Sequence, residues 1–221
     1  MKSKLITSLD GSHTLYVPEL DEHYHSINGA ISESVHIFIN SGFRYQTRNP
    51  LRIFEVGFGT GLNTLLTIVE SRKENRKVSY TTIEKYPLKA EIISNLNYPD
   101  RLGTGAKAIF DTIHNTSWFE NVQLDDNFSL RKIEGDLTEQ IPAGQFDLIY
   151  FDAFGPDKQP EMWTKDIIKQ ISIITAPGGV FVTYSARGEL KRNLRGCGFS
   201  VTALPGPRGK RHITRAIKKN N

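Results

Sequence analysis

Three alternating glycines stand between a short apolar run and a segment with the spacing of a helix. The run is 52–56, the glycines are Gly57, Gly59 and Gly61, and the helical segment is 62–70. Glycine lets the backbone approach a ligand where a Cβ atom would collide. The start of a helix adds unpaired N–H groups that point toward an anionic or polar ligand. The stretch therefore predicts a ligand-binding strand–turn–helix; the alternative is the same tight turn without a ligand.

The spacing of these glycines separates two classes of ligand. A dinucleotide-binding turn has the pattern G-x-G-x-x-G, in which the third glycine packs the helix against the strand. The chain has G-x-G-x-G, with Glu55 shortly before it and Asn63 shortly after it. This form fits the S-adenosylmethionine loop of Rossmann-like methyltransferases, which passes the amino-acid end of the cofactor and contacts no pyrophosphate. Glu55 and Asn63 therefore join the glycines as cofactor-binding candidates.

Acidic residues follow two further strands. Glu84 ends the β-branched run 78–84 and lies 23 positions after the last glycine. An acid that binds ribose hydroxyls is expected about 20 residues after such a turn, and a carboxylate accepts from two vicinal hydroxyls at once. After the next strand, Asp136 is placed to accept from an adenine amino group while Leu137 packs on the ring; Lys85 completes the cofactor set. The alternatives are a solvated strand-end charge for Glu84 and a turn or helix cap for Asp136.

A second motif carries an acid beside an aromatic wall. The motif is 150–156, and the apolar strand 146–152 ends within it at Asp152. Phe154 and Pro156 follow the strand, and Trp163 lies near the start of the next helix. A carboxylate next to aromatic faces suits an amine substrate, because the rings tolerate its cationic character. We therefore assign Asp152 to orienting an amine and to stabilising positive charge as a new N–C bond forms. The alternative is a buried Asp that caps the following helix.

The elements that must position these residues alternate between strand and helix. This alternation predicts an α/β fold with a mostly parallel, seven-stranded sheet and helices on both faces, and such sheets bind ligands at the carboxyl ends of their strands. The expected strands are 51–56, 78–84, 129–134, 146–152, 180–185, 198–204 and 212–217, and the expected helices are 62–72, 87–97, 160–174 and 187–196.

Two segments lie outside this core. Residues 5–17 predict two strands around the Asp10-Gly11 turn, and 26–46 predict an amphipathic helix with one face formed by Ile27, Ile31, Val35 and Phe38. Residues 98–128 are irregular, and we expect them to be an insertion that shapes a substrate pocket, with short helices. The chain is therefore expected to be one domain, 1–221, with an N-terminal extension (1–49), a cofactor-binding core (50–204) and a basic C-terminal part (205–221).

Composition bounds the class of protein. The 221 residues are 38% hydrophobic and include one cysteine, Cys197, which excludes an internal disulfide and a cysteine-based zinc site. No residues cluster as a metal site. No apolar run reaches the roughly 20 residues of a membrane span, and the first residues lack the pattern of a signal peptide. We expect a cytoplasmic enzyme and, since no apolar surface helix is left unassigned, a monomer.

Charge is concentrated at one end of the chain. Residues 187–221 contain ten Lys and Arg and one acid, a net charge of +9, whereas the other 186 residues contain 18 basic and 23 acidic groups, a net charge of −5. A basic face on an acidic body indicates a polyanionic partner; the alternative is a solvated helix face and a tail. Lys210 and Arg211, in a loop rich in Pro and Gly, are the strongest candidates for phosphate contacts.

The motifs together resemble one family. Glu-Val-Gly-Phe-Gly-Thr-Gly-Leu-Asn (55–63), Ile-Glu-Lys-Tyr-Pro (83–87), Asp-Ala-Phe-Gly-Pro (152–156) and Pro-Glu-Met-Trp (160–163) are similar to the methyltransferase domain of the bacterial MnmC/MnmD family. The resemblance extends in order over nearly the whole chain. It implies a class I Rossmann-like fold that uses S-adenosylmethionine to methylate the aminomethyl group on the wobble (2-thio)uridine of tRNA, giving 5-methylaminomethyl-2-thiouridine.

The resemblance also implies partners and a substrate pocket. The partner would be the anticodon loop of tRNA, and the chain resembles the stand-alone form, with a functional link to a separate flavin-dependent oxidoreductase. Where the family often has Asn before its Pro-x-x-Trp segment, this chain has Gln159. The substrate-binding candidates are Tyr24, His25, Phe154, Pro156, Trp163, Lys210 and Arg211.

Two other functions fit part of the same pattern. An N-methyltransferase for a small amine, or an aminopropyltransferase-like enzyme, would use the same cofactor cleft without tRNA. A tRNA-binding module with a vestigial fold would need neither the glycines nor Asp152, so their presence together argues against it.

Overall fold

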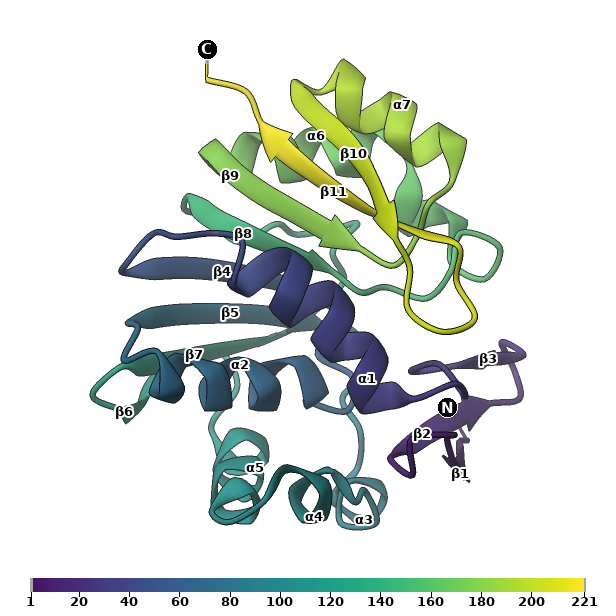
Figure 1. Cartoon of the computed structure of the whole chain (residues 1–221), viewed down its shortest axis with the longest axis vertical. Helices are drawn as coiled ribbons and strands as arrows, with labels where there is room; N and C mark the ends of the chain where they lie inside the picture. The colour runs from purple at the N-terminus through teal and green to yellow at the C-terminus, as the bar shows by residue number, and fades with distance from the viewer. Residues whose placement is uncertain (1, 221) are drawn as a thin grey trace.

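The computed structural model describes residues 2–220 and has one large central sheet (Figure 1). Its order is β10-β11-β9-β8-β4-β5-β7-β6, and of these eight strands β6 and β11 run against the others. The predicted α/β class is confirmed, with one more strand than expected in the sheet. The strands are β4 (Leu51–Val56), β5 (Val78–Glu84), β6 (Asn121–Asp125), β7 (Phe128–Glu134), β8 (Phe146–Phe151), β9 (Thr175–Thr183), β10 (Phe199–Pro205) and β11 (His212–Lys218).

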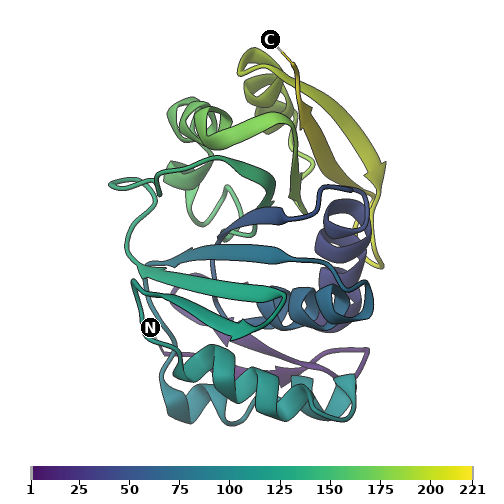
Figure 2. The same ribbon diagram turned by 90° about the vertical axis from the view of Figure 1, so that its left-hand side faces the viewer.

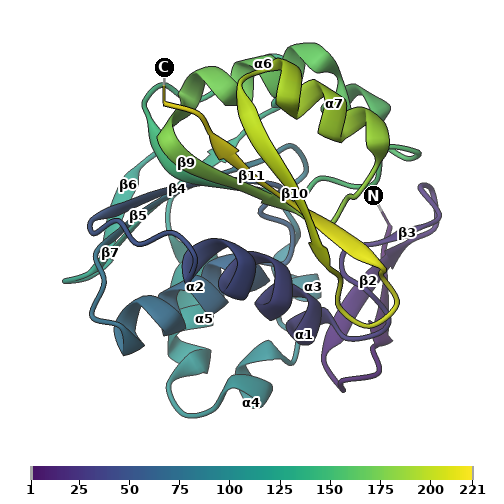
Figure 3. The same cartoon turned by 45° about the horizontal axis from the view of Figure 1, so that its top comes forward.

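Helices cover both faces of this sheet, which lies between them in Figure 3. The π-helix η1, α2 and α5 pack on one face, and α6 and α7 pack on the other. Figure 2 looks onto the β6–β7 edge, where α5 lies alongside the sheet. The helices are α1 (Ala30–Ser34), η1 (Val35–Phe43), α2 (Leu62–Lys73), α3 (Ala90–Ile93), α4 (Tyr98–Leu102), α5 (Ala106–Asn115), the short 3₁₀-helix η2 (Pro160–Trp163), α6 (Lys165–Ile174) and α7 (Gly188–Gly196).

The core is divided by the sheet because successive strand residues point to opposite faces. Along β8, Leu148 and Tyr150 join the cluster under η1 and α2, whereas Ile149 and Phe151 join the cluster under α6 and α7. Every residue of β8 is buried. A strand in the middle of a parallel sheet is covered on both faces, which explains its continuous apolar sequence. No helix within the described part of the chain is both long and apolar enough to cross a membrane.

The N-terminal extension is a small sheet, β1 (Lys4–Thr7), β2 (His13–Val17) and β3 (Glu22–His23), followed by α1. The predicted hairpin at Asp10-Gly11 is confirmed, and its turn also caps the helix. Asp10 Oδ2 accepts from the Ser32 N–H group at 2.9 Å. Ser12 Oγ accepts from the Ile31 N–H group at 3.2 Å. These side chains satisfy donors that the first turn of a helix leaves unpaired.

The prediction of one amphipathic helix over 26–46 was wrong in its start and its periodicity. The helix begins at Ala30 and becomes the π-helix η1, so the 3.6-residue spacing that singled out Ile27 does not apply; Ile27 is 50% exposed. Gly42 lets η1 approach the sheet, because a Cβ atom there would lie 3.1 Å from Tyr150. The buried residues of η1 are Ile37, Phe38, Ile39, Gly42 and Phe43.

Further predicted boundaries differ from the structure, and one is the start of β9, which begins at Thr175 rather than at residue 180. The predicted helix 87–97 is reduced to α3, because Asn97 turns away to bond the N-terminal hairpin: its side chain accepts from the His13 N–H group at 2.8 Å and donates to the Gly11 carbonyl at 2.9 Å. The predicted helix 160–174 is split into η2 and α6, and Thr164 between them caps α6. The segment 98–128 contains α4, α5 and the additional strand β6.

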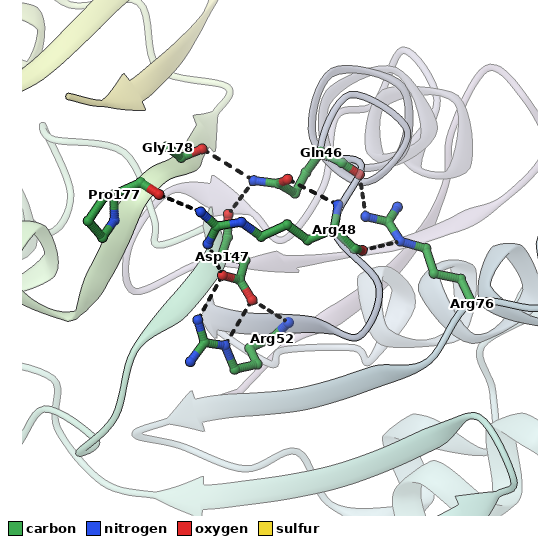
Figure 4. Close-up of polar contacts among 7 residues, drawn as sticks. All are labelled: Gln46, Arg48, Arg52, Arg76, Asp147, Pro177 and Gly178. Atoms are coloured by element: carbon green, nitrogen blue, oxygen red, sulfur yellow. Dashed lines mark hydrogen bonds and ion pairs between the residues drawn. The ribbon is translucent and has the colours of Figure 1, made fainter. Parts of the chain in front are cut away.

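A buried carboxylate, Asp147, connects neighbouring strands at their amino-terminal ends (Figure 4). Asp147 in β8 accepts from the Arg52 side chain at 2.9 and 2.8 Å and from the Arg52 N–H group at 3.1 Å, and it also pairs with Arg48. Arg48 donates in turn to the Pro177 carbonyl at 2.6 Å. Burial alone would raise the pKa of Asp147, but the bonds from Arg52 and Arg48 outweigh it and lower the pKa. The cluster therefore links β4, β8 and β9 at their amino-terminal ends, opposite to the carboxyl ends at which a ligand is expected.

We expect Asp147→Asn to lower the free energy of unfolding by about 2 kcal/mol, because the buried position loses its charge-assisted bonds. Since the pKa is lowered in the folded state, this contribution is present above about pH 4 and is lost as the pH falls. Urea unfolding at neutral and acidic pH measures both effects.

The matched control is Asp111→Asn, which removes the carboxylate of the exposed Lys107–Asp111 pair on α5. Such a pair contributes less than about 1 kcal/mol. Equal losses in the two variants would contradict the structural role of the Asp147 cluster.

Candidate active site

The loop that follows β4 is bent by its glycines. Gly57, Gly59 and Gly61 have φ values of 88°, 49° and 73°, a region in which residues with a Cβ atom are strained. A Cβ atom on Gly57 would lie 2.8 Å from the Asp152 carbonyl oxygen, and one on Gly59 would lie 3.0 Å from the Tyr24 ring. The predicted strand–turn–helix is confirmed, and its glycines let the ends of β4 and β8 and the N-terminal extension meet.

Glu84 stands beside this loop at the end of β5. One carboxylate oxygen accepts from the Gly59 N–H group at 3.0 Å, and the other accepts from the Tyr86 N–H group at 2.8 Å. Burial raises the pKa of Glu84, although these backbone bonds act in the opposite direction. A carboxylate held in this way keeps lone pairs for further donors.

A cavity of about 340 Å³ opens at the carboxyl ends of β4, β5, β7 and β8. This volume lies in the range of small-molecule sites. No residue of 98–128 lines it, so the expectation that this segment shapes the pocket was wrong; α5 supports the glycine loop from behind through His114, which lies against Gly61. The predicted site residues that line the cavity are Tyr24, His25, Gly57, Gly59, Glu84, Lys85, Asp136, Leu137, Asp152, Phe154 and Lys210.

Asp152 lies at one end of the cavity, and within residues 2–220 its carboxyl group has a single donor. Its Oδ2 accepts from Asn63 Nδ2 at 2.8 Å. Burial raises the pKa of Asp152 to about 7, while the bond from Asn63 acts against this shift. The ring of Phe154 packs edge-on against Tyr24, 5.1 Å between centroids. The end of the cavity therefore combines a weakly acidic carboxyl group with two aromatic rings.

Six of the predicted site residues do not line the cavity, and two of them, Asn63 and Trp163, support residues that do. Asn63 holds Asp152. Glu55 is fully buried within β4, where burial raises its pKa to about 8. Trp163 is buried and donates from Nε1 to the Phe154 carbonyl at 2.8 Å. The remaining three are Gly61, Pro156 and Arg211.

Gln159 and His25 hold parts of the cavity wall. Gln159 Oε1 accepts from the Phe154 N–H group at 3.2 Å, so this amide supports the aromatic wall. His25 Nε2 lies 2.8 Å from Thr60 Oγ1 and connects the N-terminal extension to the glycine loop. Burial lowers the pKa of His25 to about 4, which leaves its ring neutral at pH 7.

Asp136 and Lys85 form an ion pair at the opposite end of the cavity, 2.5 Å between Lys85 Nζ and Asp136 Oδ2. Asp136 Oδ1 also accepts from the Thr138 N–H group at 2.8 Å and from its hydroxyl group at 2.7 Å. Asp136 thus stabilises a turn, as the alternative interpretation held, and lines the cavity as well.

The structure places Lys210, which we predicted to contact tRNA phosphates, at the wall of the cavity. Its Nζ lies 2.5 Å from Glu33 Oε1, and both side chains line the cavity. Sequence reasoning missed Glu33, because nothing local distinguishes an acid on a helix from a solvated one. It also missed Tyr184, although its place directly after β9 gives the same strand-end signal as that of Glu84. In residues 2–220, no three His, Cys, Asp or Glu side chains are arranged to hold a metal ion.

The fold is of the α/β class, with a cavity at the carboxyl ends of its parallel strands, and comparisons with known proteins identify its family. A family profile described as S-adenosyl-L-methionine-dependent methyltransferase matches residues 105–219. The chain belongs to this family, in the group formed by the methyltransferase domains of MnmC proteins.

The chain is similar to curated relatives and solved structures over nearly its full length. It is 28% identical over 215 residues to the "tRNA 5-methylaminomethyl-2-thiouridine biosynthesis bifunctional protein MnmC" of Campylobacter hominis, covering 94% of this chain and 32% of that protein. The corresponding protein of Pseudomonas savastanoi pv. phaseolicola is 30% identical over 199 residues, covering 83% of this chain and 30% of that protein. This chain therefore spans about a third of the length of these relatives.

Two solved structures bear on the fold. MNMC2 from Aquifex aeolicus superposes with a TM-score of 0.82 and 27% identity, over 97% of this chain and 70% of that chain. Spermidine synthase from Thermotoga maritima has a TM-score of 0.56 and 13% identity, over 100% of this chain and 72% of that chain. The second likeness is one of fold alone.

Gly57→Ala tests the close approach of the glycine loop to β8. We expect it to lower the free energy of unfolding by the backbone strain of a positive φ, about 1–2 kcal/mol, and by a further 1–3 kcal/mol or so for overpacking against the Asp152 carbonyl.

Gly105→Ala is the matched control, because its φ is 85° and a Cβ atom there would meet nothing within 4 Å. This variant should lose only the part of the free energy of unfolding that comes from the backbone strain of a positive φ, about 1–2 kcal/mol. Denaturant unfolding of both variants measures the difference, and equal losses would mean that the loop does not approach β8 as closely as described.

Proposed function

We propose that this chain binds S-adenosylmethionine and methylates the primary amine of 5-aminomethyl (2-thio)uridine at the wobble position of tRNA. The product would be 5-methylaminomethyl-2-thiouridine, the nucleoside named in its curated relatives. The observation that carries the proposal is the position of Asp152, which lines the same cavity as the glycine loop and Glu84.

The end of the cavity at β4, β5 and β7 fits the cofactor. Glu84 accepts one backbone N–H bond on each oxygen and retains lone pairs for two ribose hydroxyls. Such donors would offset the burial of its charge. Leu137 would pack on the adenine ring, and Asp136 would accept from its amino group. When bound, S-adenosylmethionine supplies an activated methyl group, so the protein must align the reactants and exclude water.

At the other end, Asp152 would hold the amine. Asn63 occupies Oδ2, which leaves Oδ1 to accept from the substrate nitrogen. With a pKa of about 7, the carboxyl group is partly ionised at neutral pH and can take up a proton that the amine releases. The nitrogen lone pair then forms the new N–C bond while the S–C bond breaks and its electron pair remains on sulfur. The nitrogen of the product then carries the positive charge that sulfur has lost, and the proton taken up by Asp152 is released to water.

A wobble base suits this cavity because it lies in a single-stranded loop and can be turned out of its stack. The rings of Tyr24 and Phe154 offer an aromatic surface for it. Phosphate contacts would come from arginines that are exposed: Arg208 and Arg211 between β10 and β11, with Arg192 and Arg195 on α7. Such contacts give affinity that depends on salt and carries no base specificity.

The alternative substrate is a small-molecule amine. The exposed arginines favour tRNA, because a free amine needs no polyanion-binding surface. We further propose that the protein is a cytoplasmic monomer and that a separate flavin-dependent oxidoreductase acts in the same modification.

Asp152→Asn tests the reaction and its key residue together. Nucleoside mass spectrometry of tRNA that carries the aminomethyl wobble uridine, after incubation with S-adenosylmethionine, should show a gain of one methyl group. We expect the variant to lower kcat by about 100-fold or more, because the amine loses its proton acceptor, while the affinity for S-adenosylmethionine stays nearly unchanged.

The control is Asp157→Asn, an exposed acid on the same loop that pairs with Arg187, which should methylate tRNA like the wild type. Undiminished turnover in Asp152→Asn would contradict the assignment of Asp152. If the wild type binds the cofactor but adds no methyl group to this tRNA, the small-amine alternative is favoured.

A further inference from the structure

Glu33 and Lys210 form an ion pair inside the cavity, from segments 177 residues apart. Lys210 lies in the loop between β10 and β11, and Glu33 lies in α1. Their side chains are 30% and 11% exposed. Glu33 Oε2 also accepts from the Ser26 N–H group at 2.8 Å, so both of its oxygens have a partner. The pair is therefore a fixed feature of the cavity wall.

The loop that carries Lys210 is fastened to the N-terminal extension. His36 Nε2 lies 2.8 Å from the Pro205 carbonyl oxygen. Gly209 has a φ of 85°, and a Cβ atom there would lie 2.2 Å from the Asn28 side chain. The ammonium group of Lys210 stands 5.1 Å over the Tyr184 ring. These contacts hold the lysine at the cavity rather than on the outer surface.

The pair acts on Asp152 through space. The negative charge of Glu33 raises the pKa of Asp152, and the positive charge of Lys210 lowers it. Because the two charges oppose each other, their combined effect on the pKa of Asp152 is smaller than that of the Glu33 charge alone. The other titratable groups that line this end come from the N-terminal extension, from η2 and from the residue after β9: Glu22, His23, Tyr24, His25, Glu161 and Tyr184.

The balance matters for an amine substrate. An ammonium ion has no lone pair, so it must lose a proton before the nitrogen can attack a methyl group. Nearby carboxylates favour the ammonium form, and nearby cations disfavour it. With Glu33 uncompensated, a further carboxylate would face the amine beside Asp152 and favour the unreactive ammonium form.

We propose that Lys210 is a positioning residue that compensates Glu33 and thereby keeps the bound substrate amine in its neutral, nucleophilic form. This inference rests on the proposed methylation of an amine. The two residues should then have opposite effects: loss of Lys210 favours the ammonium form, and loss of Glu33 disfavours it.

The test compares pH profiles of kcat/KM for methylation of aminomethyluridine tRNA. In Lys210→Met the rise of activity with pH should move to higher pH by about one unit, and in Glu33→Gln it should move to lower pH. The double variant should return toward the wild-type profile, and Lys210→Arg, which keeps the charge, should restore it. A merely structural pair would lower activity in both single variants without opposite shifts.

Arg211→Met is the matched control, since it removes an exposed charge next to Lys210. It should raise KM and weaken the salt dependence without moving the profile. If Lys210→Met behaves in the same way, Lys210 is a phosphate contact and the inference is overturned.

A second readout needs no methyl transfer. Carboxyl ¹³C NMR titration of the protein alone should show the pKa of Asp152 rising in Lys210→Met and falling in Glu33→Gln. If the pKa of Asp152 shifts in opposite directions in the two variants but the wild type does not methylate tRNA, the proposed function is contradicted and the electrostatic role of the pair is not. Methylation by the wild type without opposite shifts would contradict the role of Lys210.

Discussion

The active site depends on carboxyl groups that are withdrawn from water at one end of the sheet. Burial raises the pKa of Glu55, Glu84 and Asp152, to about 8 for Glu55 and about 7 for Asp152. A carboxylate that is partly removed from water needs nearby donors, and Gly59 and Asn63 supply them to Glu84 and Asp152. The glycine loop therefore has two roles: it leaves room for a ligand, and its backbone holds the acid that would bind the ligand. The Glu33–Lys210 pair adds a balanced charge at the amine end.

Local patterns were sufficient to predict most of the sheet but not the segments that pack around it. Strands 51–56 and 78–84 have the expected bounds, because apolar and β-branched runs between clear turns decide them locally. The expected helices 26–46 and 87–97 were wrong, since distant residues determine where those helices start and stop. Asp10 caps α1 from a hairpin 20 residues earlier, and Asn97 bonds that same hairpin. Propensity within a segment cannot include such partners.

The residues of the candidate site likewise divide into those that local sequence predicts and those that depend on distant partners. Glu84 and Asp152 were predicted because parallel strands bring their carboxyl ends to one edge, so a position at a strand end implies a position at the cavity. Glu33 belongs to the N-terminal extension, and Lys210 belongs to the loop between β10 and β11. Only the packing of these two segments against each other brings the side chains together. A basic cluster in sequence predicted a surface for phosphates, but it could not show that one member turns inward to pair with an acid.

Cofactor binding by Glu84→Gln tests the central claim most directly: that the half-buried acid at the end of β5 is held there for the cofactor. Glutamine keeps the size of the side chain but loses the charge that would accept from two ribose hydroxyls. Hydrogen bonds to a charged group contribute about 1.5–3 kcal/mol, so calorimetry should show S-adenosylmethionine binding weakened by about 10- to 100-fold. Glu161→Gln, an acid that lines the cavity from η2, should bind like the wild type. Wild-type affinity in Glu84→Gln, with the fold intact, would contradict the account.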